Sequence, residues 1–377
     1  MNRRPQVRVA MVGLGWAARE IWLDRLLAHP GYTVVSVVDP DPKARAAWAA
    51  TGTGAGSLES VEELEPGQVD LAVVAVPNHL HGSIATRLLE RGVTVFVEKP
   101  VCLTSAESAR LAAAERSGPA VLLAGSAAVH RADVRALHAA AEGLGDIRHI
   151  EASWVRARGV PAGGGWFTRR ELAGGGALLD LGWHLFDVLG PLIGPARFDQ
   201  VAGAVSADFI AGGTAAARWR GDAPAGGAVT ADVEDTARGF LVTEDGVSVS
   251  LRTSWASHEP LDVTTVRVDG TAGTASLRCT FGFSPQRAGG SELLVGRHGR
   301  TDAVPLADQP IGVEYDRQLD DLLTRLADPG AKGRAAEEAD RTIRVIERLY
   351  ASARASRGRT SRPSNPSGAT PQPTTTM

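Results

Sequence analysis

The sequence has few cysteines, little net charge and no long apolar run. Cys102 and Cys279 are the only cysteines among 377 residues. They are too few for a disulfide framework, and no zinc-type Cys/His spacing lies between them. A formal net charge of −3 gives no basic face for nucleic acid or anionic lipid. No segment reaches the ~20 uninterrupted apolar residues of a membrane span. We therefore expect a cytoplasmic protein whose partner is a small molecule, without nucleic acid or membrane.

The first residues resemble the start of a secretory signal peptide, because Arg3 and Arg4 precede an apolar run. However, Arg8 interrupts this run, which ends at Gly13 without a small-residue cleavage site. We therefore expect the segment to belong to the fold and not to direct export.

Strand and helix patterns alternate in residues 1–126. The expected strands are 7–12, 33–38, 71–76, 93–97 and 121–124, and the expected helices are 16–27, 80–90 and 105–117. This alternation predicts a Rossmann-type doubly wound parallel sheet with helices on both faces. Because the chain exceeds the ~250 residues that one core usually serves, we expect a second domain.

The pattern changes after residue 126. A strand-like stretch is expected at 147–158, and a helix follows the glycines at 174–176. After that helix come strand-like stretches without intervening helices, at 240–255, 263–268 and 274–279, whereas further helices are expected at 133–142, 315–326 and 335–353. This order predicts an α+β domain over residues 127–355, built on a large, mostly antiparallel open sheet. Residues 356–377 are rich in Arg, Ser, Pro and Thr, which predicts a disordered tail.

A glycine-rich turn follows the first expected strand. Gly13, Gly15 and Ala18 form the pattern G-x-G-x-x-A. The first glycine permits a tight turn, the second lets a pyrophosphate approach the backbone, and the alanine lets helix and strand pack closely. The helix amino terminus then favours an anion. A purely structural turn is the alternative, but the flanking strands favour a dinucleotide site.

Asp39 ends the second expected strand, where a carboxylate can accept both ribose hydroxyls of adenosine and repel a 2′-phosphate. Asp41 adds to that repulsion, so NAD is favoured over NADP. Lys43 and Arg45 lie close enough to leave NADP possible. An Asp-Pro turn with no ligand is the alternative reading.

Lys99 follows another strand, within Glu98-Lys99-Pro100. Ligands of an open parallel sheet lie outside the carboxyl ends of its strands, where this segment and Pro77-Asn78 both fall. A lysine held there can donate to a substrate hydroxyl or ketone and set the acidity of that oxygen. The alternative is a solvated lysine.

Asp180 and His184 are spaced i, i+4 in an expected helix that begins after Gly174-Gly175-Gly176. An imidazole can take a proton from an alcohol near neutral pH, and a carboxylate can fix its tautomer. Gly182 between them would leave room for a ligand or another backbone. The alternatives are a surface pair and a metal site formed with Asp187.

The order of these motifs resembles the glucose-fructose oxidoreductase, inositol dehydrogenase and MocA (Gfo/Idh/MocA) family over most of residues 6–355. The resemblance implies NAD(P)-dependent oxidation or reduction of a secondary alcohol in a sugar or cyclitol. It also implies a homodimer or homotetramer built by the open sheets. Lys99, Asp180 and His184 match the family's catalytic set, with the carboxylate orienting the imidazole.

The resemblance and the motifs together imply two groups of binding residues. The cofactor-binding residues are expected to be Gly13, Gly15, Trp16, Ala17, Asp39, Pro77, Asn78, His81, Glu98 and Lys99. The substrate-binding residues are expected to be Lys99, Arg156, Trp166, Asp180 and His184. For His81, a structural role beneath the cofactor is equally open. Trp16 and Ala18 depart mildly from the family pattern.

The arginines leave the substrate open. Trp154, Arg156 and Arg158 alternate on one expected strand, and Arg169 and Arg170 follow a glycine-rich loop. They could hold a phosphate or nucleotide-sugar diphosphate, or form a solvated or subunit-contact face. The substrate is therefore a free sugar or inositol, or a nucleotide-linked or phosphorylated sugar oxidised at C3 before transamination. A cofactor-binding regulator or partner subunit is the non-enzymatic alternative, although such a protein needs none of the three catalytic residues.

Overall fold

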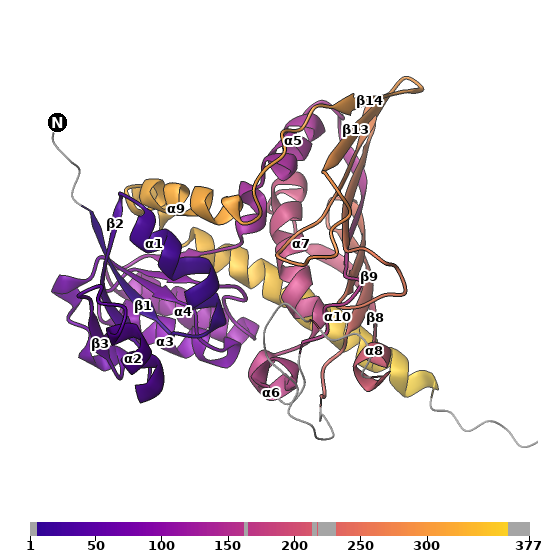
Figure 1. Cartoon of the computed structure of the whole chain (residues 1–377). Helices are drawn as coiled ribbons and strands as arrows, with labels where there is room; N and C mark the ends of the chain where they lie inside the picture. Colours follow the sequence, from indigo (N-terminus) through magenta and orange to yellow (C-terminus); the bar gives the residue numbers. More distant parts are fainter. Residues whose placement is uncertain (1–5, 162–164, 213–216, 218–230, 361–377) are drawn as a thin grey trace, which may run out of the picture.

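The computed structural model describes residues 6–161, 165–212, 217 and 231–360 (Figure 1). The first sheet has six parallel strands in the order β3-β2-β1-β4-β5-β6. Its strands are β1 (Val7–Val12), β2 (Tyr32–Val38), β3 (Gly56–Leu58), β4 (Leu71–Val74), β5 (Val95–Val97) and β6 (Leu122–Ala124). The predicted doubly wound sheet is confirmed.

Helices cover both faces of this sheet. They are the π-helical segment Ala18–Leu23 with α1 (Asp24–Ala28), α2 (Pro42–Ala49), α3 (Asn78–Glu90) and α4 (Ser105–Ser117). Val9 and Met11 of β1 belong to one apolar cluster, whereas Ala10 and Val12 belong to another on the opposite face. Because both faces are buried, the strands carry continuous apolar runs instead of alternating ones.

The second sheet has eight strands in the order β14-β13-β12-β11-β7-β10-β9-β8. These are β7 (Ile147–Val155), β8 (Phe198–Ser206), β9 (Thr236–Thr243), β10 (Ser248–Ser254), β11 (Val263–Gly270), β12 (Gly273–Cys279), β13 (Glu292–Arg297) and β14 (Arg300–Val304). Only β7 and β10 pair in parallel within the described sheet, so the predicted mostly antiparallel arrangement is confirmed. The stretch expected as one strand, 240–255, is the hairpin of β9 and β10.

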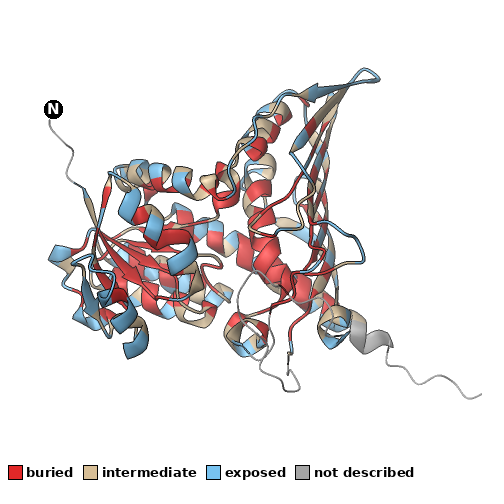
Figure 2. Ribbon diagram, viewed as in Figure 1, coloured by how far each residue is buried: buried red, intermediate tan, exposed pale blue. Residues whose placement is uncertain are grey.

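One face of the second sheet packs against helices, among them α5 (Ala132–Ala141) and α7 (Ala177–Ile193), with the short α6 (Arg170–Ala173) and α8 (Asp208–Gly212) near its end (Figure 1). Ile150 and Ala152 of β7 are buried on that face, whereas Glu151 between them is exposed. Figure 2 shows α7 buried along most of its length. A helix apolar on nearly all sides is typical of a core position.

The last two helices, α9 (Val313–Leu326) and α10 (Arg334–Thr360), return to the first domain. Leu319 and Leu322 of α9 join the core beneath α1, and the Tyr32 hydroxyl donates to the Leu319 carbonyl over 2.6 Å. The helix α10 contacts α4 and β6 on one side and β8 on the other. Both domains therefore depend on these helices.

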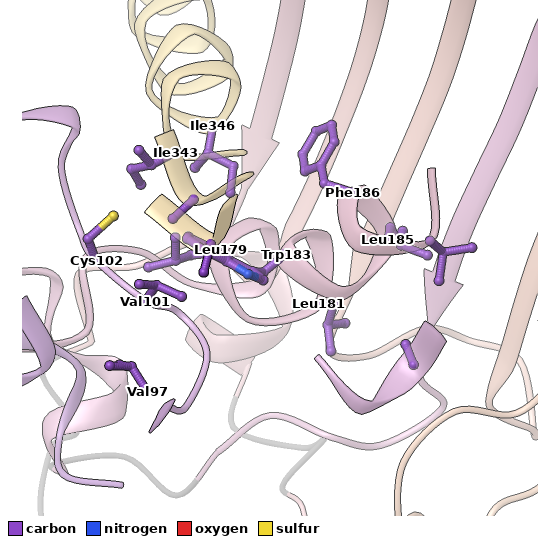
Figure 3. Packing of buried hydrophobic residues seen from close by; sticks show 14 of the residues in the cluster. Val97, Val101, Cys102, Leu179, Leu181, Trp183, Leu185, Phe186, Ile343 and Ile346 are labelled. Carbon is purple, nitrogen blue, oxygen red and sulfur yellow. The ribbon is translucent and has the colours of Figure 1, made fainter. Parts of the chain in front are cut away.

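The two domains share one apolar cluster. Figure 3 shows Leu179 and Trp183 of α7 among residues from the first domain and from α10, namely Val97, Val101, Cys102, Ile343 and Ile346. Cys102 and Cys279 are both buried and unbridged. The cytoplasmic location expected from the cysteine content remains a prediction.

The stretch Arg170–Ile193 is long and apolar enough to cross a membrane, but 72% of its most apolar window is buried inside the protein. We attribute its character to its place in the core.

The first residues of the expected tail, 356–360, belong to α10, which continues to Thr360, so the prediction is wrong for them. Residues 361–377 lie outside the described part of the chain.

Candidate functional site

The glycine-rich turn lies at the carboxyl end of β1. Gly13 has φ +92°, and a Cβ there would lie 2.6 Å from the Ala75 carbonyl oxygen. Only glycine fits this position without strain. By contrast, a Cβ on Gly15 would meet no atom within 4 Å. An open backbone face at the second glycine, just before a helical segment, fits a dinucleotide pyrophosphate.

Asp39 lies beside this turn. One carboxylate oxygen accepts a hydrogen bond from the Leu14 N–H over 2.7 Å, and the other accepts from the Asp41 N–H over 2.8 Å. Asp39 thus supports the turn and also forms the local turn that the alternative reading predicted. The Asp41 side chain caps α2 by accepting from the Lys43 N–H over 2.9 Å. A charged carboxylate next to the pyrophosphate turn fits an unphosphorylated adenosine ribose.

Trp16 and Ala17 complete the turn. Ala17 precedes the helical segment that starts at Ala18. The Trp16 ring meets Phe283 of the second domain edge to face, with 6.1 Å between centroids. Phe283 in turn stacks on Tyr315 of α9 at 5.7 Å. The bulky residue in the turn therefore connects the nucleotide half to the second domain.

Three residues expected at the cofactor have backbone or structural partners. Both ring nitrogens of His81 lie against carbonyl oxygens, Pro100 O at 2.7 Å and Val76 O at 2.8 Å. The Asn78 side chain donates to the Ala173 carbonyl over 3.0 Å, so it ties α3, which begins after Pro77, to α6. Because the ring is buried and both nitrogens are engaged, the structural reading of His81 is favoured.

Glu98 is the third of these residues. Its carboxylate accepts from the Trp22 indole over 2.8 Å and from the Lys99 N–H over 2.9 Å. Burial raises the pKa of Glu98, while the charge of Lys99 opposes the rise. This carboxylate fixes the backbone that presents Lys99, and the bond between Lys99 and Pro100 is cis.

Lys99 and Asp180 meet across the domain boundary. The Lys99 ammonium donates to Asp180 Oδ1 over 2.6 Å, and the other carboxylate oxygen accepts from the Trp255 indole over 2.9 Å. The Arg156 guanidinium lies 4.0 Å from the same carboxylate. Asp180 is only 7% exposed, so the surface-pair alternative is wrong. The expected convergence of lysine and carboxylate is present.

His184 lies one turn further along α7 and is 9% exposed. Its Nδ1 forms a hydrogen bond with the Ser126 hydroxyl over 2.8 Å, and its ring lies 5.4 Å from that of Trp154. We expected Asp180 to orient this ring. That expectation needs correction, because Lys99 and the Trp255 indole draw the carboxylate away, and the hydroxyl of Ser126 orients the imidazole.

The environment of His184 opposes a positive charge. Burial holds the pKa of His184 well below its usual value, and the charges of Lys99 and Arg156 act in the same direction. The Asp180 carboxylate opposes them only in part. The imidazole is therefore neutral near pH 7 and has one N–H to place on either nitrogen.

The three glycines before α7 position this constellation. The buried Glu234 carboxylate accepts from the N–H groups of Gly176 and Leu178, each over 3.0 Å, and from the Tyr350 hydroxyl over 2.7 Å. A Cβ on Gly175 would overlap the Tyr350 hydroxyl, and one on Gly176 would overlap the Glu234 carbonyl oxygen. The glycines thus let Glu234 satisfy the free amino end of the helix.

Of the two roles expected for Gly182, close packing with a neighbouring element is favoured over room for a ligand. A Cβ at this position would lie 3.1 Å from the Leu178 side chain and 3.8 Å from the Thr253 methyl of β10. The missing side chain therefore lets α7 pack closely on the sheet and leaves no room for a ligand. The packing is a property of the core, not of the site.

The expected substrate residues divide into two groups. Arg156 is buried, with its guanidinium over the Trp154 ring at 5.1 Å, so it lies within the site. Trp166 is half-buried and meets Phe167 edge to face at 5.0 Å. Arg170 instead lies over the Tyr350 ring at 5.3 Å and belongs to the support of α7. Residues 162–164 of the glycine-rich loop lie outside the described residues.

Two residues of the site were not predicted from the sequence, namely Ser126 and Trp255. Ser126 lies two residues after β6, and Trp255 directly follows β10. The signal available for the serine was its position just after a strand, at the carboxyl edge of the parallel sheet, where ligands bind.

The metal site considered as an alternative has no support, because no group of three His, Cys, Asp or Glu side chains in the described ranges could hold a metal ion.

Two family models match the chain. A model described as an oxidoreductase family with an NAD-binding Rossmann fold matches residues 7–126. A model of the GFO/IDH/MocA C-terminal domain matches residues 134–276. The two matches fall on the two domains of the structure.

Individual relatives match over nearly the whole chain. A putative UDP-kanosamine synthase oxidoreductase subunit from Amycolatopsis mediterranei is 57% identical, over 94% of this chain and 98% of that protein. A dTDP-3,4-didehydro-2,6-dideoxy-alpha-D-glucose 3-reductase from Streptomyces antibioticus is 26% identical, over 93% of this chain and 98% of its own length. The structure of the WlbA dehydrogenase from Bordetella pertussis, in complex with NADH and UDP-GlcNAcA, shares the fold. Its TM-score is 0.69 at 20% identity, over 93% of this chain and 98% of that chain.

Proposed function

The chain belongs to the Gfo/Idh/MocA family of sugar oxidoreductases, and we propose that it oxidises a secondary alcohol of a nucleotide-linked hexose to a ketone with NAD. The observation that carries this proposal is the Lys99–Asp180 ion pair at 2.6 Å, one helical turn from the buried His184. These groups lie next to the end of the parallel sheet, where its ligands bind. The oxidoreductase relatives favour an enzyme over the regulator that the sequence left open.

The names of the relatives support a nucleotide-linked substrate. One concerns a UDP-linked amino sugar and another a dTDP-linked keto sugar. The dTDP-sugar relative is named as a 3-reductase, so we propose C3 as the carbon oxidised here, before an amine is introduced. The buried Arg156 offers a guanidinium for a phosphate or a sugar hydroxyl. A free sugar or inositol remains the second candidate.

Each residue of the site has a separate role in the proposed oxidation of the alcohol. The Lys99 ammonium donates to the reacting oxygen and stabilises its negative charge. His184 takes the hydroxyl proton through Nε2, since Nδ1 is engaged by Ser126. Asp180, held by the Trp255 indole, keeps the ammonium in place. Gly13, Gly15 and Asp39 would hold NAD, which supplies the hydride acceptor when bound.

A substrate screen tests the proposal. NADH formation should be faster in kcat/KM with UDP-glucose than with free glucose, glucose 1-phosphate or myo-inositol, by about 100-fold, because charged hydrogen bonds hold the diphosphate. Hydroxylamine would trap the ketone for identification by mass spectrometry. The same assay with NADP should give the lower kcat/KM, because Asp39 repels a 2′-phosphate. Equal activity on free and nucleotide-linked sugars would reject the substrate class.

We also propose that copies of the chain associate through the open face of the second sheet. Phe240 of β9 is 50% exposed and Leu261, two residues before β11, is 39% exposed, so both present apolar area to a partner. Arg238 and Arg252 lie directly opposite each other on β9 and β10. Their like charges repel, and contact with a second copy would offset this repulsion. Analytical ultracentrifugation should show a dimer or tetramer, and Phe240→Asp should shift it toward monomer. A wild-type monomer would refute the assembly.

A further inference from the structure

His184 is hydrogen-bonded to Ser126 through Nδ1, the ring nitrogen that does not take the substrate proton. The Ser126 hydroxyl, two residues after β6, forms its 2.8 Å hydrogen bond with Nδ1 of His184. The same oxygen lies 3.4 Å from the Ala128 N–H, which donates to it. A hydroxyl can accept two hydrogen bonds while it donates one. Ser126 therefore has the capacity to accept from the imidazole and to donate to a further group.

Asp187 is that further group. It follows His184 by three residues on α7, so both side chains lie on one face of the helix. The residue is half-buried, but its Oδ2 is buried and has no hydrogen-bond partner among the described residues. The carboxyl group also lies close enough to the Ser126 hydroxyl for that hydroxyl to lower the pKa of Asp187. A buried carboxyl oxygen without a partner calls for an explanation in a native fold.

The surroundings of Asp187 make its carboxyl group change protonation state slightly above neutral pH. Burial raises the pKa of Asp187 to about 8, and the charge of Glu338 on α10 acts in the same direction. The Ser126 hydroxyl and the charge of Lys99 oppose the rise. Below about pH 8 this carboxyl group is a donor, and above it the group is an acceptor.

The reaction presents His184 with a problem of charge. If Nε2 takes the proton of the alcohol and Nδ1 keeps its own, an imidazolium forms in a buried site beside Lys99 and Arg156. These surroundings oppose that charge. The cost disappears if Nδ1 releases its proton as Nε2 gains one, because the imidazole then stays neutral throughout.

We propose that Ser126 and Asp187 form a proton relay behind His184. In the oxidation proposed above, bound NAD would supply the hydride acceptor, and the hydroxyl proton passes to His184 Nε2. The Nδ1 proton moves to the Ser126 oxygen as the Ser126 hydroxyl proton moves to the Asp187 carboxylate. The imidazole ends as the other neutral tautomer and Asp187 ends protonated. Reduction of the ketone runs the same transfers backwards.

The relay couples the protonation of Asp187 to the tautomer of His184. An ionised Asp187 accepts from Ser126, which then accepts from Nδ1–H, so that Nε2 is free to act as a base. A protonated Asp187 donates to Ser126, which then donates to Nδ1, so that Nε2 carries the proton. Ser126 and Asp187 are thus positioning residues, which act through the imidazole.

The tautomer can be measured without substrate or cofactor. In protein labelled with ¹⁵N at histidine, the His184 ring, assigned by its loss in His184→Asn, should pass from the Nε2–H to the Nδ1–H tautomer as pH rises through about 8. Asp187→Asn cannot ionise and should hold one tautomer across this range. Ser126→Ala should lose the transition, whereas Ser126→Thr, which keeps the hydroxyl, should retain it.

Kinetics supply the second readout. The kcat for oxidation should rise with pH up to about 8 and then level off. In Asp187→Asn this step should disappear and kcat should fall about 10-fold to 100-fold, with KM changed less than about threefold.

The relay rests on the proposed function, but the two fail separately. A His184 tautomer in the wild-type protein that does not change between about pH 6 and 10 would overturn the relay, whatever the substrate. A pH step that persists in Asp187→Asn would overturn it too. A tautomer transition in a protein that oxidises no sugar nucleotide would leave the relay standing and reject only the substrate.

Discussion

Replacing Lys99 with alanine should lower kcat for sugar oxidation about 1,000-fold, while the dissociation constant for NADH changes less than about threefold. The ammonium is the group placed to stabilise the charge that develops on the reacting oxygen, and such a donor acts mainly in the transition state. Steady-state kinetics and a fluorescence titration with NADH measure the two quantities.

A second variant distinguishes loss of catalysis from loss of folding stability. Without Lys99, the buried Asp180 carboxylate loses its ion pair, which by itself destabilises a protein. The double variant Lys99→Met with Asp180→Asn removes both charges at nearly constant volume. It should melt close to the wild type and remain inactive. A Lys99→Ala variant that keeps kcat within threefold of wild type would remove the lysine from the mechanism.

Gly176→Ala should lower the free energy of unfolding by roughly 3 to 5 kcal/mol. The new methyl group would overlap the carbonyl oxygen of Glu234, a backbone atom two residues before β9, so the main chain itself would have to shift. The shift would also break the hydrogen bonds from the start of α7 to the Glu234 carboxylate. Urea unfolding followed by circular dichroism gives the free energy.

Gly190 in the same helix provides a matched control. A Cβ there would meet no atom within 4 Å, so Gly190→Ala should change stability by no more than about 1 kcal/mol, in the stabilising direction. Equal destabilisation by the two substitutions would show that loss of glycine, and not the contact with Glu234, is responsible.

Much of the architecture follows from periodicity. The first five expected strands could be recognised as continuous apolar runs, because both faces of the first sheet are buried. The hairpin of β9 and β10 was missed, although Asp245-Gly246 between the strands is a turn signal and Gly246 has φ +91°. The apolar residues on either side of this turn read as one strand when the turn is overlooked.

The site shows where prediction from sequence reaches its limit. The i, i+4 spacing places Asp180 and His184 on one helical face, which is correct. Which group each side chain contacts depends on residues far away in the chain. Lys99 precedes Asp180 by 81 positions and Ser126 precedes His184 by 58, and only the tertiary fold decides between such partners. A serine after a strand is too common to be noticed alone.

Because α9 and α10 return to the first domain, residues up to 126 do not contain all of that domain's core. A fragment that stops after residue 126 would lack Leu319 and Leu322, which close the core over β1 and α1. It would also lack α10, which covers α4. The nucleotide half is therefore not a portable module. A graft of this half onto another protein would have to include α9 and α10, which follow the second sheet in the sequence.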